Sequence, residues 1–359
     1  MSRQQQGMVL LAVISVILLI LPQTNLLGNN YRVTLIRDGF FYAILASSWA
    51  LLAGVSGQFS FGHMAFMAIG AYTAGILGRD GVAIIGLAGG EIHPLMTIIA
   101  GTIMAGFVGF IIGVLLLRLR AAYLALFTIA FSELIRIGLI TEFQFTGGSN
   151  GLEFRPLFAS TSARLDYYIM FVLLVVSLAV MYSLSNSRFG MFLRAIREDE
   201  EAAAAMGVDI VRYKVLIFVI TSAIVGLAGG VFYHQVGIIT PNSIVLLQMS
   251  LVIAYAVIGG MESLLGATVG AFVSRIVIEL LREIPIGTTI TIGDFSLGPT
   301  IEPGAWRFAL FGLIMIITLR FARNGLLYAI IQWFSERHVA IEQTVSKRVT
   351  DPAPEEVAS

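Results

Sequence analysis

The stretch SNSRFGMFLRAIREDEEAAAAMGVDIVRY, residues 185–213, lies between two long apolar segments and is the longest charged interruption before the C-terminal tail. It carries both acidic and basic side chains, so it is not simply a basic loop that faces lipid. Within it, Glu201-Ala202-Ala203 favours a helix, and Gly207 suits the position that follows a helix end. A polar helix on a largely apolar chain cannot be buried in lipid. We therefore expect this helix to be a docking surface for a soluble protein.

The composition places the chain in a membrane. Of its 359 residues, 57% are hydrophobic and 12% are charged, and the mean hydropathy is +0.90. Soluble domains carry roughly 25% charged residues, about twice this fraction. The net charge of zero gives no indication of a nucleic-acid partner, and the absence of cysteine excludes disulfides and thiolate chemistry. The 37 glycines suit close contacts between helices in a bilayer.

A helix needs about 20 apolar residues to cross the hydrocarbon core of a bilayer. Ten stretches approach or reach that length: Met8–Leu21, Gly39–Val55, Phe61–Leu77, Leu95–Leu117, Ala121–Ile140, Asp166–Leu184, Lys214–Val236, Ile244–Ile258, Leu264–Leu281 and Trp306–Arg320. No small-residue cleavage pattern follows the first stretch, so we interpret it as an uncleaved span. The first and eighth stretches are short. The sequence thus predicts an all-α polytopic membrane protein with about ten transmembrane helices, eight to ten.

Arginines set the orientation, because cytoplasmic loops of membrane proteins carry an excess of basic residues. Arg118 and Arg120 end one span, and the polar loop 185–213 follows two crossings later, so both basic segments can be cytoplasmic. Arg32 and Arg37 fall on the outside and depart from the pattern. Both termini are then expected in the cytoplasm.

The same orientation divides the chain into two regions. We expect residues 1–334 to form the transmembrane domain and residues 335–359 to form a polar, disordered cytoplasmic tail. The segment Thr141–Leu165 is expected to face the outside. Its turn Thr146-Gly147-Gly148-Ser149-Asn150-Gly151 is either a backbone nest for an anion or a plain exterior turn, and the plain turn is favoured.

Two glycine-containing breaks, Gly54–Gly62 and Gly259–Gly266, interrupt pairs of apolar segments. Such paired breaks indicate an internal repeat and a substrate path, although both could be ordinary turns of helical hairpins. Polar side chains at the first break either line that path or cap helix ends. The candidate path residues are Gly57, Gln58, Ser60, Gly62, His63 and, on a later span, Glu133.

Charged pairs inside the spans have two interpretations. Glu133 and Arg136 lie three residues apart on one helical face, and Arg275 and Glu279 lie four apart. Charges in a bilayer usually face the bundle interior and pair with one another. Each pair is either a contact in a transport path or a self-neutralised structural or inter-subunit tie, and the structural interpretation is favoured.

No enzyme constellation occurs. The four histidines are scattered, without metal-ligand spacing, so we predict no catalytic residue, no metal site and no enzymatic activity. No glycine precedes a lysine, so the phosphate-binding loop GxxxxGK[ST] is absent. We expect no cofactor in this chain. If ATP drives it, other subunits must bind the nucleotide.

Three motifs in order carry a resemblance: GQFSFGHMAFMAIGAYTAG (57–75), TGGSNGL (146–152) and SRFGMFLRAIREDEEAAAAMGVDIVRYK (187–214). They resemble the LivM-type permease of branched-chain amino acid ABC importers, over most of residues 39–320. The last motif is similar to the EAA signature of bacterial import permeases, whose spacing Glu201, Ala202, Ala203 and Gly207 keep. The later Ile falls on Ile217, whereas Val219-Ile220 replaces the family's Leu-Pro.

The resemblance implies a multi-pass permease of the bacterial inner membrane, working with a second permease subunit, two ATP-binding cassette subunits and an extracytoplasmic solute-binding protein. The coupling helix would sit in a cleft of the ATPase, with Ala202, Ala203 and Met206 on one face. The residues expected to couple to the ATPase are Arg194, Arg197, Glu198, Glu201, Ala202, Ala203, Met206 and Gly207. The cargo would be branched-chain amino acids, with urea or other amides as an alternative.

A second class of function is an ion-coupled secondary transporter, with Glu133, Glu262 or Glu279 at its ion site. That reading gives the Glu201–Gly207 segment no task, which counts against it.

Overall fold

The computed structural model describes residues 18, 21–23, 29–80, 92–116, 121–158, 162–282, 290–292, 295–297, 306–321 and 325. The predicted span Met8–Leu21 lies almost wholly outside these residues, and the predicted tail 335–359 lies entirely outside them. Arg118 and Arg120, which contributed to the predicted orientation, are also outside the described part of the chain.

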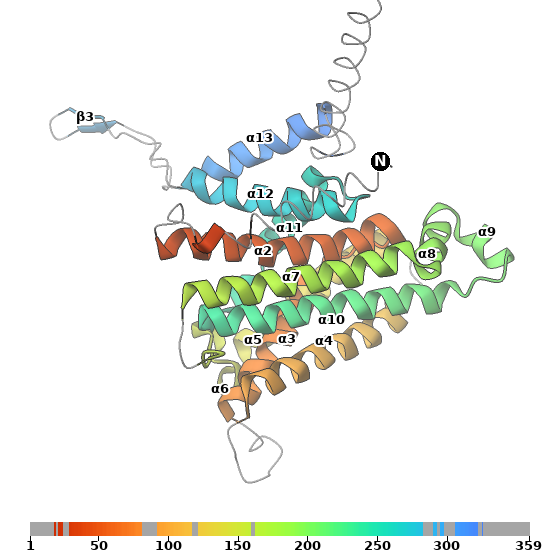
Figure 1. Ribbon diagram of the computed structural model, residues 1–359, viewed down its shortest axis with the longest axis horizontal. Coiled ribbons are helices and arrows are strands. Elements are labelled where there is room, and N and C mark those ends of the chain that lie inside the picture. The colour runs from red at the N-terminus through yellow and green to blue at the C-terminus, as the bar shows by residue number, and fades with distance from the viewer. Residues whose placement is uncertain are drawn as a thin grey trace, which may run out of the picture.

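Long helices form most of the described structure (Figure 1). They are α2 (Asn30–Ala50), α3 (His63–Asp80), α4 (Pro94–Leu116), α5 (Ala121–Thr141), α7 (Ala163–Asn186), α10 (Ile210–Val236), α11 (Leu246–Gly259), α12 (Leu264–Arg282) and α13 (Trp306–Phe321). The shorter helical elements are η1 (Leu21–Gln23), the π-helical segment η3 (Leu51–Val55), α6 (Phe143–Thr146), η5 (Gly148–Asn150), α8 (Arg188–Glu198), α9 (Glu200–Ala205) and η6 (Pro241–Ile244).

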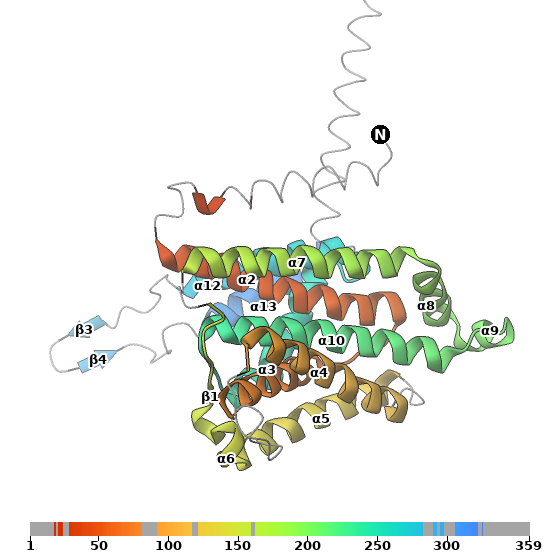
Figure 2. The ribbon, with the colours of Figure 1, turned by 60° about the horizontal axis from the view of Figure 1, so that its bottom comes forward.

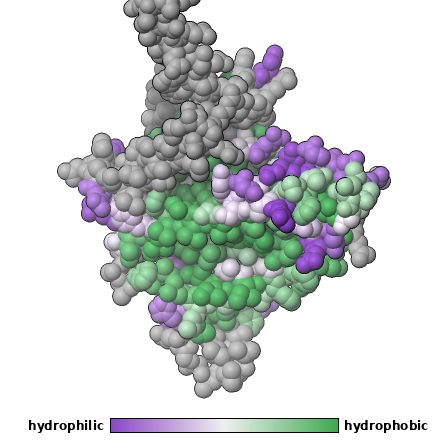
Figure 3. Space-filling view, turned by 45° about the vertical axis from the view of Figure 1, so that its right-hand side comes forward, coloured by the Kyte–Doolittle hydropathy of each residue, from purple (hydrophilic) through white to green (hydrophobic). Residues whose placement is uncertain are grey.

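Six helices in the described part of the chain are long and apolar enough to cross a membrane. They are α2 with η3, α4, α5, α7, α10 and α12, while α11 is a shorter apolar helix. The all-α prediction is therefore confirmed, whereas the count of ten transmembrane helices is not. Figure 3 shows apolar side chains across the middle of one face, with hydrophilic residues gathered toward the edges. This distribution suits a bundle surrounded by lipid.

Two predicted boundaries were wrong. Helix α2 begins at Asn30 and not at Gly39, because Asp38 forms ion pairs with Arg37 (2.8 Å) and with Arg275 of α12 (3.7 Å). Charges that suggested a loop are thus satisfied within the bundle. Helix α10 begins at Ile210 and not at Lys214, because the Asp209 carboxylate accepts a hydrogen bond from the N–H of Arg212 (3.1 Å) and caps the helix.

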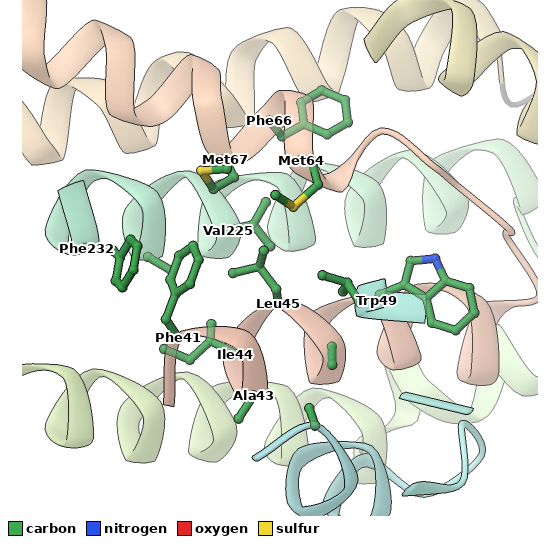
Figure 4. Packing of buried hydrophobic residues seen from close by; sticks show 14 of the residues in the cluster. Phe41, Ala43, Ile44, Leu45, Trp49, Met64, Phe66, Met67, Val225 and Phe232 are labelled. Atoms are coloured by element: carbon green, nitrogen blue, oxygen red, sulfur yellow. The ribbon is translucent and has the colours of Figure 1, made fainter. Parts of the chain in front are cut away.

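Helices α2 and α10 form the centre of the bundle, since both are buried over most of their length. The rings of Phe41 on α2 and Phe232 on α10 stack with centroids 3.9 Å apart. Figure 4 shows these two rings facing each other, beside the methionines Met64 and Met67 of α3. The core therefore joins the first, middle and later parts of the chain.

Glycines allow α3, α4 and α10 to approach backbone to backbone. A Cβ built on Gly70 would lie 2.5 Å from the Cα of Gly226, and one on Gly101 would lie 2.2 Å from the carbonyl oxygen of Gly70. No side chain larger than hydrogen fits at such distances. Small residues at helix contacts are the usual means of close packing in membranes.

Short strands close one end of the bundle. Strand β1 (Leu152–Glu153) pairs antiparallel with β2 (Ile238–Ile239), with Leu152 opposite Ile239. The pairing fastens the loop after α5 to the end of α10. Helices α8 and α9 lie at the opposite end (Figure 1). A separate hairpin joins β3 (Ile290–Ile292) to β4 (Phe295–Leu297).

The glycine contact yields a test of the fold. We expect Gly70→Ala to lower the free energy of unfolding by about 1–3 kcal/mol, because the added methyl group overpacks the contact with Gly226. Gly78→Ala, in the same helix, is the matched control, since a Cβ there meets nothing within 4 Å. The measurement is thermal unfolding in detergent; equal unfolding temperatures for the two variants would contradict the packing described.

Candidate functional site

Helices α8 and α9 fold the charged loop onto the end of the bundle. In α8, Leu193 and Ile196 are buried, while Arg188, Arg194 and Glu198 are exposed and Arg197 is partly buried. The ring of Tyr213, on α10, packs against Phe189 and Phe192 of α8 at centroid distances of 5.4 and 5.2 Å. This apolar contact holds α8 in place although the segment is highly charged.

Helix α9 is capped at both ends. The carboxylate of Asp199 accepts hydrogen bonds from the N–H groups of Glu201 (2.9 Å) and Ala202 (3.0 Å), which is a standard N-cap. At the other end Gly207 has φ +83°, and its N–H donates to the carbonyl of Ala204 (2.9 Å). The prediction that Gly207 follows a helix end is confirmed. A helix of six residues is short, so these caps are needed to define it.

Much of α9 and its C-terminal turn is exposed. Glu201 and Ala202 are exposed, and Met206 is 85% exposed although it is hydrophobic. A Cβ on Gly207 would meet nothing within 4 Å. The prediction that Ala203 shares one outer face with Ala202 and Met206 was wrong, because Ala203 is buried at 6% exposure. The helix therefore rests on its own chain through Ala203.

Arg197, at the end of α8, reaches two other turns of the chain. Its Nη1 donates to the carbonyl of Gly54 in η3 and lies 3.7 Å from the carboxylate of Glu262, in the turn between α11 and α12. Its Nη2 pairs with Glu198 at 2.8 Å. Its side chain also covers Gly57, where a Cβ would lie 2.9 Å from the Arg197 Cγ. We call this set of contacts the Arg197 junction.

The two glycine-containing breaks of the sequence meet at this junction. A Cβ on Gly54 would lie 2.0 Å from the carbonyl oxygen of Met261, so the break after α2 touches the break between α11 and α12. The sequence placed these breaks in separate halves of the chain. Their contact agrees with paired turns at one end of the bundle, and the internal repeat itself stays a prediction.

Further polar contacts attach the loop to its neighbours. Lys214 of α10 is buried and forms an ion pair with Glu200 of α9. The carbonyl of Lys214 lies 3.5 Å from the amide nitrogen of Gln58. Arg194 donates to the carbonyl of Ser185 at the end of α7 (2.5 Å). Arg194 and Arg197, both expected to face an ATPase, thus bind this chain's own backbone.

Of the predicted path residues near α3, Gln58, Ser60, Gly62 and His63 are buried and Gly57 is partly exposed. The hydroxyl of Ser60 accepts a hydrogen bond from the N–H of Gly62 (3.1 Å), so Ser60 stabilises the turn before α3 but is not the N-cap of that helix, and its pore role stays a prediction. Trp49 donates to the carbonyl of Ser60 (2.8 Å). The side-chain oxygen of Gln58 and both ring nitrogens of His63 are buried without a hydrogen-bond partner among the described residues, with the Ser48 backbone a polar neighbour of His63.

Glu133 lies in α5. The contact of this helix with the segment before α3 is made by Thr128, whose hydroxyl oxygen accepts a hydrogen bond from the N–H of Phe61 (2.9 Å). Glu133 instead forms a two-point ion pair with Arg136, with Nε–Oε2 at 2.9 Å and Nη2–Oε1 at 2.5 Å. The predicted pairing is confirmed. A role of Glu133 in a path stays a prediction.

The glycine-rich turn after α5 binds itself. The hydroxyl of Thr146 accepts from the N–H of Gly148 (3.2 Å) and donates to the carbonyl of Leu139 (2.6 Å). The N–H of Asn150 donates to the carbonyl of Gly147 in the same turn, and the N–H of Gly147 donates to the carbonyl of Phe143 in α6. The described hydrogen bonds therefore favour the plain turn over the anion nest, while Ser149 and Asn150 are exposed.

The predicted pair of Arg275 with Glu279 is confirmed, but sequence reasoning missed the charge network to which the pair belongs. Asp38 of α2 pairs with Arg275 of α12, which in turn pairs with Glu279 at 2.9 Å, and Arg282 pairs with Glu279 at 3.0 Å. The Arg275 guanidinium also lies 5.0 Å from the centroid of the Tyr42 ring. The signal was available, because Asp38 and Arg275 are charges next to apolar stretches, but their distance in sequence hid the pairing. Within the described residues, no cluster of three or more His, Asp or Glu could hold a metal ion.

Comparisons with known proteins agree on one family. The sequence profile described as "branched-chain amino acid transport system / permease component" matches residues 31–319. The chain is 32% identical over 284 residues to the high-affinity branched-chain amino acid transport system permease protein LivM of Escherichia coli K12, covering 71% of this chain and 65% of that protein. The match thus spans slightly less than two thirds of that relative.

Two further relatives extend the comparison. The probable LivM permease of Methanocaldococcus jannaschii is 25% identical over 315 residues, covering 80% of this chain and 90% of that protein. The LivH permease of E. coli is 24% identical over 247 residues, covering 66% of this chain and 80% of that protein. No solved structure matches the chain.

The Arg197 junction yields a prediction about the loop. Arg197→Ala removes the hydrogen bond to Gly54 and the ion pairs with Glu198 and Glu262, so we expect α9 to open more readily by about 1.5–3 kcal/mol. Hydrogen exchange of the amides at 200–208 measures this opening. Arg188→Ala, at an exposed position of α8, is the control. Equal exchange in the two variants would show that the junction does not hold the loop.

Proposed function

Because the chain belongs to the family of branched-chain amino acid transport permease components, we propose that it is the membrane-spanning permease subunit of an ATP-binding cassette importer. The observation that carries this proposal is α9. It is a polar, doubly capped helix at one end of an apolar bundle, and it exposes Glu201, Ala202 and Met206. An exposed helix of this kind is a docking element for a soluble subunit.

The chain must obtain its energy from partners in this proposal. It contains no phosphate-binding loop, so two ATP-binding subunits supply the nucleotide site. Both LivM and LivH proteins are among the relatives, and their names describe permease proteins of one kind of transport system. We therefore infer that a second permease completes the membrane part. A solute-binding protein would deliver the substrate on the other side.

The proposed mechanism moves α9 as a lever. Closure of the ATPase subunits on nucleotide would displace α9, and the Arg197 junction would carry the displacement to the turn after α2 and to the turn between α11 and α12. These turns lead into α3 and α12, so helices in both halves of the bundle would shift together. ATP binding then biases a two-state equilibrium between outward-open and inward-open forms.

The proposed cargo is a branched-chain or related hydrophobic amino acid, with urea or another amide as the alternative. Gln58 and His63 are the polar candidates for the path, because each keeps a buried atom without a hydrogen-bond partner among the described residues. Unpaired buried polar groups are costly and often mark function. Gly57, Ser60 and Gly62 lie in the same segment, and we propose that they set its backbone conformation.

The rival function, an ion-coupled secondary transporter, fits the structure less well. Glu279 is occupied by Arg275 and Arg282, and Glu133 by Arg136. Glu262 lies at the Arg197 junction, at the end of the bundle. Each of the three carboxylates is thus paired with at least one arginine of this chain.

Orientation provides one test. With α9 in the cytoplasm, the turn at residues 146–151 faces the outside. The chain has no cysteine, so single cysteines at the exposed positions Ser187 and Ser149 can be labelled in intact spheroplasts with an impermeant maleimide. We expect labelling at Ser149→Cys only. Labelling at Ser187→Cys alone would show that the orientation is the opposite, with α9 outside the cytoplasm and out of reach of the ATPase.

The coupling helix provides a second test. We expect Gly207→Asp to abolish uptake and to reduce recovery of the ATPase from membranes. The reason is that a Cβ at positive φ costs about 1 kcal/mol and the added side chain enlarges the docking surface. Glu201→Arg should have the same effects to a lesser extent. Gly237→Asp is a matched control for ATPase recovery. Gly237 also has positive φ (+91°) and open space around a Cβ, but it lies at the other end of α10.

Permease levels must be matched before the two variants are compared. Normal uptake and normal ATPase recovery with Gly207→Asp would contradict a docking role for α9 and would leave the loop only the role of connecting α7 to α10.

A further inference from the structure

Helix α5 carries a charged pair on its surface, deep within an apolar span. Glu133 and Arg136 bind each other at two points, yet their side chains are 46% and 23% exposed. Glu133 lies about 15 Å along the apolar span Tyr123–Thr141, at ~1.5 Å per residue. This position is near the middle of the span, and Arg136 lies just under one turn further along it.

The acidic partner of the other charge network in the bundle is better covered. Glu279 is 9% exposed, against 46% for Glu133, whereas Arg275 and Arg136 are similarly covered at 19% and 23%. Asp38 of another helix also helps to neutralise Arg275. Lipid tails cannot hydrogen-bond to the remaining lone pairs of the more exposed Glu133 carboxylate.

The same helix is the least buried of the six long apolar helices. It lies at the rim of the bundle, beyond α3 and α4 as seen in Figure 2. Its exposed face includes Ala130, Leu134 and Gly138, and a Cβ on Gly138 would meet nothing within 4 Å of this chain. Small residues on an exposed helix face permit the backbone of another helix to approach closely.

We propose that this face of α5, centred on Ala130 and Leu134, with Gly138 on one side and the Glu133–Arg136 pair at its other edge, is the surface against which the second permease chain packs. The inference rests on the proposed function, which supplies a second permease. The occupant must lie within the membrane at the depth of Glu133, which a soluble ATPase or binding protein cannot reach. It must also offer polar groups to the Glu133–Arg136 pair, which lipid cannot.

A homologous permease lies in the membrane and so meets the first requirement, and we assign it the polar groups of the second. LivH proteins align with most of this chain, so a protein of that kind offers a bundle of similar helices. We commit to such a homologue and not to a second copy of this chain. In the complex the ion pair would become an inter-subunit contact, with its outer atoms bonded to the partner.

Photo-crosslinking in the assembled transporter tests the surface. A benzoylphenylalanine probe replaces Leu134, which is 68% exposed, and the same probe at Val176 in the middle of α7, 53% exposed, is the control. We expect the probe at 134 to form an adduct with the second permease and the probe at 176 to form none with it. An adduct of the 134 probe with lipid alone, or with another copy of this chain, would overturn the proposal.

A matched pair of glycine variants tests the same surface without a probe. Gly138→Leu and Gly312→Leu both add a side chain where this chain offers no neighbour within 4 Å. We expect Gly138→Leu to recover about tenfold less second permease at matched levels of this chain, and Gly312→Leu to match the unsubstituted protein. Equal recovery in both variants would place the interface elsewhere.

These outcomes separate the inference from the proposed function. If the unsubstituted chain recovers neither a second permease nor ATP-binding subunits, the proposed function fails first. If it recovers the whole complex while the 134 probe and Gly138→Leu behave like their controls, only the assignment of the α5 face fails.

Discussion

The hydrogen bond from Arg197 to the carbonyl of Gly54 is the contact on which the proposed coupling depends. It joins the charged loop at residues 185–213 to the end of α2 with η3, the most buried of the six long apolar helices. The ion pair with Glu262 extends the same connection to the turn between α11 and α12. A docking helix that was merely tethered by flexible chain could not move the membrane helices. The Arg197 guanidinium contacts the backbone of one turn and the carboxylate of another, so a displacement of α8 can reach both turns.

The placement of charge explains much of the remaining architecture. Where charges are enclosed, as in the network of Asp38, Arg275 and Glu279, they tie α2 to α12 within the bundle. Where a charge is partly exposed on a span, as with Glu133 of α5, it marks the face that we propose the second permease covers. Glycines complement this pattern, since contacts such as Gly70 against Gly226 bring α3 and α10 together without a polar group.

The sequence predicted the all-α membrane fold, the capped helix with Gly207 at its end and the Glu133–Arg136 pair, because each depends on residues close together in the chain. It could not predict that Gly54, Arg197 and Glu262 meet, since they come from three separate segments. The burial of Ala203 was missed for a related reason. A helix of six residues has no apolar stripe long enough to show which side faces the bundle.

In the proposed function, this chain transports only when ATP-binding subunits drive it. The direct measurement is uptake of a radiolabelled branched-chain amino acid into proteoliposomes that contain either the whole complex or this chain alone. We expect ATP-dependent, gradient-independent uptake by the complex and none by the chain alone. Robust uptake by the isolated chain under a proton or sodium gradient, without nucleotide, would contradict the proposed function and identify a secondary transporter.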